Sequence, residues 1–550
     1  MNTHCLATSI FAFFFLSVVF LPQVSIAQRW EFARVLQAQQ TCNLAKIEIG
    51  KNNQLLIVGD ATGEIPFAGG TLGNDGIDSA YGLLLCTDTV GVDRWGRWFR
   101  HVFPHDVAVD AKGNIIVLAI LQGTATIDGQ QFTSTGKRYD LLLMKFDTAG
   151  KLLWGKVGGS NQADDIPHVV VNPDGLIAVV AECYGPATFG SLVSKFRGGR
   201  DCVVFGFSQD GTERWVVTIG STEKDNVLGI TMNQAGESYI LGKIADSTWV
   251  EDSLTISESN HNNYREPFIC RITPQGEVDW FKRFNIGYVD NMNLIEENGV
   301  LHAVFQFTST ITLDTFSFTS IGTSGLVVVE MERSGAIRKI ALSITSPQSC
   351  IATNLFRRQG ESFIVASFGD RVFTGSDSVV LGNILWINTI IIGGESLAAP
   401  RFTTTGGGNG FDYPQDAAML PSGKIICLGL LQGTKATFGE FNFNFPKPTQ
   451  RGLLAIFNPE TTPTAVPPAT TERREPTILQ HSSSLLLSVS EQFTTCSLGL
   501  FALDGIQLAS QKASAASSAQ LPLEGLPSGG YLLEIMIDGY RFSKRIVVVR

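Results

Sequence analysis

The stretch Tyr139–Gly175, YDLLLMKFDTAGKLLWGKVGGSNQADDIPHVVVNPDG, decides the fold, because edited copies of it recur about every sixty residues up to about residue 460. The first landmark of each copy is Gly-x-x-x-Trp, as at Gly150 and Trp154; further copies start at Gly91, Gly211 and Gly276, with a degenerate one at Gly335. The second is a turn closed at Asn53, Gly113, Gly175, Gly236, Gly299, Gly360 and Gly423. Glycine and asparagine tolerate the positive φ that tight turns need, so these landmarks indicate hairpins.

Four strand-like segments lie in each period, and several are continuous apolar runs, as expected of strands that are covered on both faces. In the second copy we expect them at Val107–Asp110, Asn114–Ala119, Leu141–Asp147 and Lys151–Val157. Four strands that repeat seven times are typical of a β-propeller, in which each blade packs against its neighbours. The sequence therefore predicts an all-β, seven-bladed propeller.

The last repeat lacks one strand, and the chain supplies a spare one at its other end. The seventh copy ends at Gly452–Phe457 and runs into a proline-rich stretch without its Trp strand, whereas Arg29–Leu36 has no earlier strands of its own. Trp30 precedes Asn53 by 23 residues, close to the 21 residues between Trp154 and Gly175. We expect Arg29–Leu36 to complete the last blade and leave no open sheet edge.

The repeat resembles the sixty-residue β-propeller repeats of exported bacterial proteins. The matching features are D-x-x-G-N followed by an apolar strand (Asp110–Val117), and a second apolar strand that ends in D-x-x-G before the Trp (Asp147–Gly150). The resemblance covers residues 28–460, and we assign the propeller to residues 28–458. Because the repeated residues are turn and packing positions, the resemblance implies a fold and no particular activity.

The N-terminus predicts export. Residues 1–27 contain the apolar run Ile10–Leu21 and end in Ser-Ile-Ala, so we expect a signal peptide cleaved between Ala27 and Gln28. A run of twelve apolar residues is short for a membrane anchor, the alternative reading, and no later segment predicts a transmembrane span. The formal charge of −10, without a basic block, argues against nucleic acid as a partner.

The C-terminal part has a different composition. Residues 459–477 are rich in proline and threonine and predict an extended linker, and residues 478–550 alternate as in a small β-sandwich with Asp-Gly turns. Three pieces, Leu500–Leu508, Leu521–Ile535 and Asp538–Arg550, are similar to the C-terminal sorting domain of proteins exported by the type IX secretion system of Bacteroidota. The positions that carry this similarity are Asp504, Gly505, Leu526, Pro527, Gly530, Tyr531 and Lys544. The similarity implies that residues 478–550 engage the outer-membrane secretion machinery and bring the protein to the cell surface or the medium. The family's Pro-Asn-Pro opening is absent, and only Glu475-Pro476 stands near that place, which leaves the start of the domain open.

Binding residues are expected on the face where the longer connections of each blade open, since loops on a rigid scaffold commonly carry function. His105 and His168 enter adjacent blades at nearly equivalent points, with Asp106 beside the first, so they could line the channel mouth and bind a metal or move protons. Asp164 and Asp165 form an acidic loop in the same region. Residues that cap strand ends are the plainer reading of His105, Asp106 and His168. The acidic loop could hold calcium, and a solvated turn is its plainer reading.

Two further candidates lie in other loops. Asn74, Asp75 and Asp78 place oxygen ligands at a spacing that suits calcium, but they lack the closing acidic residue of a calcium loop, so a solvated turn is the alternative. No other cofactor is predicted. Trp249 falls outside the Trp register and could be a stacking platform for a sugar. Of the cysteines, Cys86, Cys202, Cys270 and Cys427 lie in apolar strands as small hydrophobic residues, and one disulfide among the eight that follow the signal remains open.

No catalytic motif is embedded in the repeats, so the leading interpretation is an exported propeller that binds an extracellular ligand such as a glycan, a protein or an envelope component. The alternatives are a polysaccharide hydrolase or lyase with carboxylates that converge on the channel, and a purely structural surface protein. Three or more acidic or His side chains that meet at the channel mouth would favour the enzyme.

Overall fold

The computed structural model describes residues 29–459 and 477–548. The segments left out of the first range are 74–79, 136–138, 246, 257–264, 285–291, 309, 314–315, 320–323, 347–349, 370, 375–376, 381–386 and 395–401, and those left out of the second are 481–483, 503–506, 524–525, 527–528 and 538–539. The chain divides into two compact units, Met1–Thr462 and Pro463–Arg550, and the division falls inside the predicted linker. Apart from the 3-10 turn η1 (Lys51–Asn53), the regular elements of the described residues are strands.

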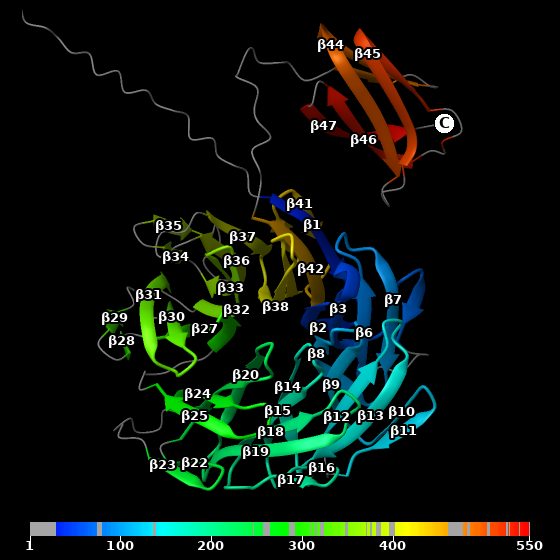
Figure 1. Cartoon of the computed structure of the whole chain (residues 1–550). Coiled ribbons are helices and arrows are strands. Elements are labelled where there is room, and N and C mark those ends of the chain that lie inside the picture. Colours follow the sequence, from blue (N-terminus) through cyan, green and yellow to red (C-terminus); the bar gives the residue numbers. More distant parts are fainter. Residues whose placement is uncertain are drawn as a thin grey trace, which may run out of the picture. The chain divides into compact units, whose positions relative to one another are not determined.

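The first unit is a ring of seven four-stranded antiparallel blades, which follow one another around the ring in chain order (Figure 1). From the inner to the outer strand, blade 1 consists of β2 (Thr41–Ile49), β3 (Leu55–Thr62), β6 (Ala80–Thr87) and β7 (Asp93–Phe99). Blade 2 consists of β8 (Val102–Val109), β9 (Ile115–Leu121), β12 (Asp140–Phe146) and β13 (Leu152–Gly159). Blade 3 consists of β14 (Asp164–Val171), β15 (Ile177–Cys183), β18 (Asp201–Phe207) and β19 (Glu213–Ser221). Blade 4 consists of β20 (Asn226–Met232), β21 (Ser238–Ile244), β24 (Glu266–Ile272) and β25 (Val278–Arg283).

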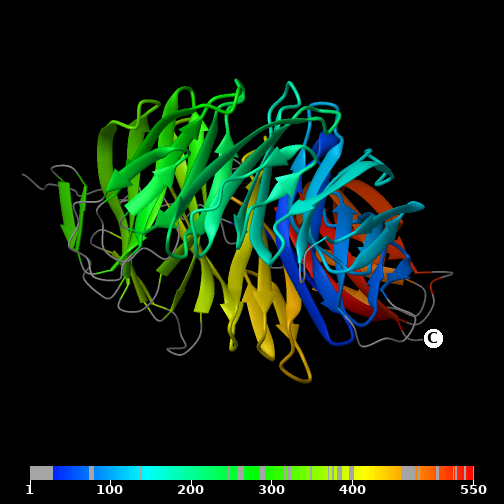
Figure 2. The same ribbon diagram turned by 90° about the horizontal axis from the view of Figure 1, so that it is seen from below.

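The remaining blades repeat this order, and the last one takes its outer strand from the start of the chain. Blade 5 consists of β26 (Met292–Glu297), β27 (Val300–Phe307), β30 (Ser324–Glu332) and β31 (Ile337–Ser346). Blade 6 consists of β32 (Cys350–Arg358), β33 (Glu361–Gly369), β36 (Ile387–Gly394) and β37 (Phe402–Gly408). Blade 7 consists of β38 (Tyr413–Met419), β39 (Ile425–Leu431), β42 (Arg451–Asn458) and β1 (Arg29–Leu36). Figure 2 shows the same strands from the side, running between the two faces of the ring. The prediction of a seven-bladed propeller closed by the N-terminal strand is confirmed.

The apolar runs form the walls between blades. Every residue of β9 and β12 is buried, because alternate side chains of each strand enter the packing layer on either side of the blade. Leu142 packs with Leu56 of blade 1, whereas Leu143 packs with Val179 of blade 3. The seven glycine or asparagine turns join first and second strands with positive φ, as predicted. At Gly113, with φ of +88°, the turn is closed by the Asp110 carboxylate, which accepts the backbone N–H groups of Lys112 and Asn114.

The Gly-x-x-x-Trp landmark proves to join neighbouring blades. A methyl group on Gly150 would lie 2.8 Å from the ring of Trp95 in the preceding blade, and one on Gly211 would lie 3.2 Å from Trp154. Each outer-strand Trp therefore packs under the glycine turn of the next blade, where only a residue without Cβ leaves room. This contact recurs for the pairs Trp215 with Gly276 and Trp280 with Gly335.

The register of the closing strand differs from the prediction. Phe32, and not Trp30, occupies the Trp slot, because Phe32 packs against Gly91 of blade 1 and pairs with Ile456, as Trp154 pairs with Lys145. Trp30 pairs with Phe457 beyond a bulge and corresponds to Leu152. Phe32 precedes Asn53 by 21 residues, as Trp154 precedes Gly175, and blade 2 has the same bulge between Leu152 and Trp154. The exact spacing therefore indicates Phe32, and Trp30 was chosen for its residue type.

A small hairpin occupies the second connection of every blade, where irregular loops were expected. In several cases it pairs with the outer strand of the preceding blade, so that β16 extends blade 2, β22 extends blade 3, β34 extends blade 5 and β40 extends blade 6. The hairpins are β4 (Ile65–Phe67) with β5 (Gly70–Leu72), β10 (Thr124–Ile127) with β11 (Gln130–Thr133), β16 (Thr188–Phe189) with β17 (Leu192–Val193), β22 (Ser247–Val250) with β23 (Ser253–Ile256), β28 (Thr310–Leu313) with β29 (Phe316–Thr319), β34 (Arg371–Thr374) with β35 (Asp377–Val380), and β40 (Lys435–Phe438) with β41 (Phe441–Asn444).

The second unit is also built from strands. Its described strands form one five-stranded sheet of β43 (Thr477–Gln480), β44 (Ser484–Ala502), β45 (Gln507–Pro522), β46 (Gly529–Ile537) and β47 (Tyr540–Val548). The long strand β44 pairs with β45 along its length, with β43 in its first half and with β46 in its second. Buried Leu498, Leu500, Leu521, Leu533 and Ile535 supply its apolar core.

Candidate functional site

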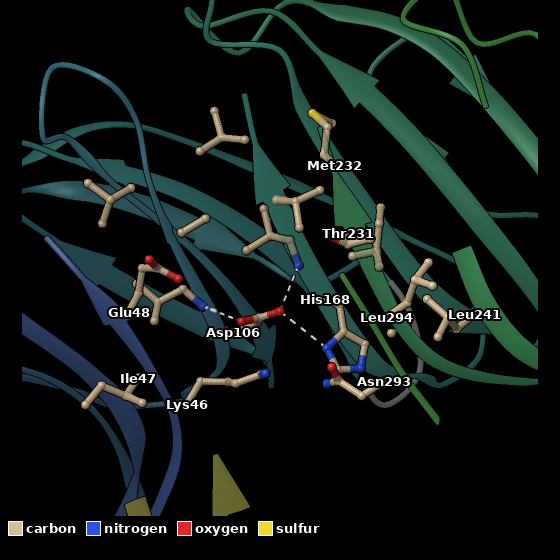
Figure 3. Close-up of a pocket in the computed structure, with 18 of the residues that line it drawn as sticks. Lys46, Ile47, Glu48, Asp106, His168, Thr231, Met232, Leu241, Asn293 and Leu294 are labelled. Atoms are coloured by element: carbon tan, nitrogen blue, oxygen red, sulfur yellow. Dashed lines mark hydrogen bonds and ion pairs between the residues drawn. The ribbon is translucent and has the colours of Figure 1, made fainter. Parts of the chain in front are cut away.

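The inner strands carry a bulge that turns a polar residue toward the central channel. Register shifts lie just before Lys46 in β2, Asp106 in β8, His168 in β14, Asn354 in β32 and Asp416 in β38. Lys46, Asp106 and His168 line a cavity of about 300 Å³ within the ring. Figure 3 shows Asp106 in the middle of this cavity, with His168 on one side and Lys46 and Glu48 on the other.

The carboxylates of this channel bind the backbone of the next blade. Oδ2 of Asp106 accepts a hydrogen bond from the backbone N–H of Val169 at 3.0 Å, and Oδ1 accepts one from the N–H of the next residue, Val107, at 2.8 Å (Figure 3). Asp416 accepts the Ile47 N–H at 2.9 Å and pairs with Lys46 at 3.1 Å, which links blade 7 to blade 1. An innermost strand has no further strand to pair with, so these side chains satisfy backbone groups that would otherwise lack partners.

The charges of the channel compensate one another. Burial would raise the pKa of Asp106, but the His168 hydrogen bond at 3.3 Å and the nearby Lys46 charge hold the pKa below its ordinary value. Burial raises the pKa of Glu48 to about 7. The channel thus contains several ionisable groups, as the enzyme interpretation requires. In Asp106 and in Asp416, however, both carboxylate oxygens are engaged in hydrogen bonds or ion pairs within the scaffold.

A larger pocket of about 720 Å³ opens between blades 2 and 3 on the face where the long connections lie; we call it the loop-face pocket. Phe103 and His105 come from the start of β8, and Gln122 follows the end of β9. Tyr139 precedes β12, and Tyr184 follows β15. The other lining residues are Ile120, Gln162, Ala163, Asp164 and Asp165.

Backbone hydrogen bonds hold the rim of this pocket. The Tyr139 carbonyl accepts the Asp164 N–H at 3.3 Å, and the Ala163 carbonyl accepts the Tyr184 N–H at 3.4 Å. The Tyr184 hydroxyl accepts a hydrogen bond from the guanidinium of Arg200 at 3.2 Å, and the same guanidinium pairs with the buried carboxylate of Glu182 at 2.6 Å. The aromatic walls are therefore positioned by the scaffold before any ligand binds.

The ionisable groups of the pocket have shifted pKa values. His105 is exposed on the wall of the cavity, and desolvation by the neighbouring protein lowers its pKa, which favours the neutral imidazole. Burial raises the pKa of Asp164 to about 6. Asp164 is 1% exposed, its Oδ2 accepts the Ser160 N–H at 2.7 Å, and its Oδ1 has no described nitrogen or oxygen partner.

Asp164 also has a structural role that its counterparts share. Asp225 in blade 4 accepts the N–H of Ser221 and that of Ala245, and Asp412 in blade 7 accepts the N–H of Gln432. Burial raises the pKa of both groups, to about 6 for Asp225. A raised pKa at this repeat position therefore accompanies a carboxylate that holds a loop by accepting hydrogen bonds from its backbone, and it does not by itself identify a catalytic acid.

The predicted binding residues divide between the two cavities. His105, Asp164 and Asp165 lie together in the loop-face pocket, whereas Asp106 and His168 line the channel, so the predicted His105–His168 site is separated into two. Neighbours along a strand point in different directions, and the bulge at His105 sends its side chain away from Asp106.

Trp249 lies in strand β22 at the outer edge of blade 3 and not in a loop. The guanidinium of Arg197 covers one face of its ring, 4.7 Å from the centroid. A sugar could therefore stack only on the other face.

The remaining predicted sites have little or no description. Asn74, Asp75, Asp78, Ala27, Gln28, Asp504, Gly505 and Pro527 lie outside the described residues. Leu526 donates its N–H to the Leu523 carbonyl at 3.3 Å, Gly530 and Tyr531 belong to β46, and Lys544 pairs with Leu533 across β46 and β47. Among the described residues, no group of three or more His, Cys, Asp or Glu side chains is arranged to hold a metal ion.

The cysteines settle one open alternative. Cys86, Cys202, Cys270 and Cys427 are buried in strands as expected, and all eight described cysteines are free thiols. In the described part of the chain, no helix is long and apolar enough to span a membrane.

The sequence reasoning missed the aromatic walls of the pocket, Phe103, Tyr139 and Tyr184. A position-by-position comparison of the repeats could have found them. A parallel β-bridge joins Tyr139 to Ala163, and an equivalent parallel bridge joins Arg200 to Lys224 one blade later. The repeat position that holds tyrosine in blade 2 therefore holds arginine in blade 3.

Comparison with known proteins shows the fold alone. No protein-family profile matches the chain, and no curated protein sequence matches it. Among solved structures, the polysaccharide lyase Uly1 aligns over 76% of this chain and 90% of its own with 11% identity and a TM-score of 0.41. A mutant of the Synechocystis apocarotenoid oxygenase aligns over 74% and 89% with 10% identity and a TM-score of 0.36, and Drosophila Semaphorin 2a over 92% and 96% with 7% identity and a TM-score of 0.38. The strand order makes the chain a seven-bladed propeller, and no sequence comparison assigns it to a family.

Proposed function

We propose that this protein is an exported propeller that binds a glycan in the loop-face pocket. The observation that carries the proposal is the lining of that pocket, where Phe103, Tyr139 and Tyr184 stand beside the amides of Gln122 and Gln162. Aromatic faces with a few convergent polar groups are the usual composition of a pocket for a small ligand or a sugar unit.

The rigidity of the rim supports binding. The backbone bonds at Tyr139 and Ala163 and the contact of Tyr184 with Arg200 fix the walls, so binding does not have to order them.

A glycan array probed with the chain from residue 28 onward tests this proposal. We expect a defined set of glycans to bind, and Tyr139→Ala to weaken that binding about tenfold or more through the lost aromatic surface. Trp249→Ala is the matched control, since it removes an aromatic ring at another edge of the ring of blades. Binding that Trp249→Ala abolishes and Tyr139→Ala leaves intact would place the site elsewhere.

The enzyme alternative receives less support. A hydrolase needs two carboxylates that are free to act on a substrate, but Asp106 and Asp416 are engaged by backbone N–H groups of the next blade. Glu48 is the remaining carboxylate that lines the described channel cavity. Binding without turnover is therefore the function that we propose.

Export by the C-terminal unit belongs to the same proposal and rests on the signal sequence and on the similarity of residues 478–550 to sorting domains. Deletion of residues 478–550 should leave a folded propeller in the periplasm. Undiminished secretion of the shortened chain would refute the sorting role without touching the binding site.

A further inference from the structure

The charge of the loop-face pocket narrows the class of glycan. Asp164 and Asp165 line it, and none of the lining residues that the structure describes is lysine or arginine. The guanidinium of Arg200, which contacts the lining residue Tyr184, is paired with Glu182, and desolvation lowers the pKa of His105, which favours its neutral imidazole. The described lining therefore opposes anionic sugars, because a uronate or sulfate would meet carboxylates there without a basic partner.

The buried carboxylate of Asp164 also favours a cationic ligand. Oδ1 of Asp164 has no described nitrogen or oxygen partner although the residue is 1% exposed, and the group beside it is the thiol of Cys183, a weak donor. An unpaired buried carboxylate oxygen is costly and is stabilised by a cationic donor. Asp412, at the same position in blade 7, also has an unpaired oxygen, but Asp164 is the one that lines this pocket.

The aromatic walls suit a cation as well. Ammonium groups are attracted to the faces of tyrosine and phenylalanine rings, by about 0.5 to 2 kcal/mol according to how far they are desolvated. Phe103 and Tyr139 supply two such rings, and Asp165 supplies an exposed carboxylate at the rim. The guanidinium of Arg200 already lies over the Tyr184 ring, 5.5 Å from its centroid.

Resting on the proposed glycan-binding function, we infer that the loop-face pocket recognises an amino sugar, with the ammonium group held between the rings of Phe103 and Tyr139 and the exposed carboxylate of Asp165, near the buried charge of Asp164. The amides of Gln122 and Gln162 would bind the ring hydroxyls. A neutral sugar would leave the carboxylates without a counter-charge.

Isothermal titration with four oligosaccharides of equal length tests the inference on the chain from residue 28 onward. The probes are a β-1,4-glucosamine hexamer, its fully N-acetylated form, the β-1,4-glucose hexamer and a uronate hexamer. We expect the glucosamine hexamer to bind at least about tenfold more tightly than the two neutral hexamers, and the uronate hexamer to bind most weakly.

Two variants make the test specific. Asp165→Asn, an isosteric change of an exposed side chain, should reduce glucosamine binding about tenfold and leave the neutral hexamers unchanged. Asp174→Asn removes a carboxylate from the exposed glycine turn on the opposite face and should change nothing. A thermal melt of each variant checks that the fold is retained.

The outcomes separate the two levels of the proposal. Equal binding of charged and neutral hexamers, or no effect of Asp165→Asn, would overturn the amino-sugar inference and leave glycan binding standing. Preference for the uronate, or equal binding of a hexalysine peptide, would overturn it as well. If no hexamer binds and the glycan array is also blank, both proposals fail.

Discussion

Closure of the ring by β1 leads to a quantitative prediction for Trp30→Ala. The Trp30 side chain is 4% exposed and packs against Phe438 and Phe457, with ring centroids 5.2 and 5.4 Å away. Truncating a buried aromatic side chain to alanine usually costs about 3 to 5 kcal/mol. The indole N–H of Trp30 has no described partner, and removing a buried unpaired donor recovers about 1 to 3 kcal/mol. The midpoints of these two ranges give an expected net loss of about 2 kcal/mol.

Calorimetry of the chain from residue 28 onward measures this loss. For a unit of about 430 residues the unfolding entropy is roughly 0.9 kcal/mol/K, so Tm of the larger transition should fall by about 2 °C. Trp30→Phe keeps the ring contacts and removes the unpaired N–H, and should stay within about 1 °C of the parent. Leu153→Ala is the control, since this exposed side chain lies on the outer strand of blade 2, next to the residue that corresponds to Trp30. An unchanged Tm for Trp30→Ala would refute the claim that β1 is an integral part of blade 7.

Three further predictions concern the packing and the charge of the ring. Gly150→Ala should destabilise the propeller by roughly 1 to 3 kcal/mol, because φ is +80° and the added methyl group meets Trp95. In urea denaturation, adding Trp95→Leu to this variant should restore part of the lost free energy of unfolding. If the effects of the two substitutions are simply additive, the contact between the blades is contradicted. Lys145→Met should cost about 3 to 5 kcal/mol, since it leaves the buried Asp110 carboxylate without the ammonium now 2.8 Å away; a Tm equal to that of the parent would show that the ion pair contributes nothing. Burial raises the pKa of Asp201 to about 7, so the folded state binds more protons than the unfolded state, and stability should decrease as pH rises from about 4 to 8. Asp201→Asn should flatten the dependence of Tm on pH in thermal melts. A Tm that rises over this pH range would contradict the assignment.

The fold could be predicted because its signals are local. A positive φ at Gly113 or Gly175 is required by the turn itself, and an apolar run such as β9 is required by packing on both faces, so each repeat carries its own evidence. The position of β1 was predicted but its slot residue was not, because tryptophan fills this slot in blades 1 to 4 and Phe32, which keeps the 21-residue spacing to Asn53, differs in residue type.

The candidate site was predicted only in part for a related reason. His105, Asp164 and Asp165 were selected for their chemistry and do lie in one pocket, whereas Asp106, selected with them, turns into the channel. Side-chain direction in a bulged strand is set by the insertion of one residue, which the sequence does not announce. Tyr139 was missed because it stands next to a landmark and was counted as part of the scaffold.

The repeat explains why a cavity opens between blades 2 and 3. Tyr139 and Ile120 correspond by strand register to Arg200 and Glu182 one blade later, where the two side chains form a buried ion pair at 2.6 Å. In that later gap Asn226, the counterpart of Asp165, donates a hydrogen bond to Glu182 at 3.2 Å, so its polar groups satisfy one another. Between blades 2 and 3 the same three positions hold Tyr139, Ile120 and Asp165, which do not form such an ion pair and instead line the loop-face pocket. The repeat thus supplies the gap, and the departures from it leave a pocket for the ligand that we propose.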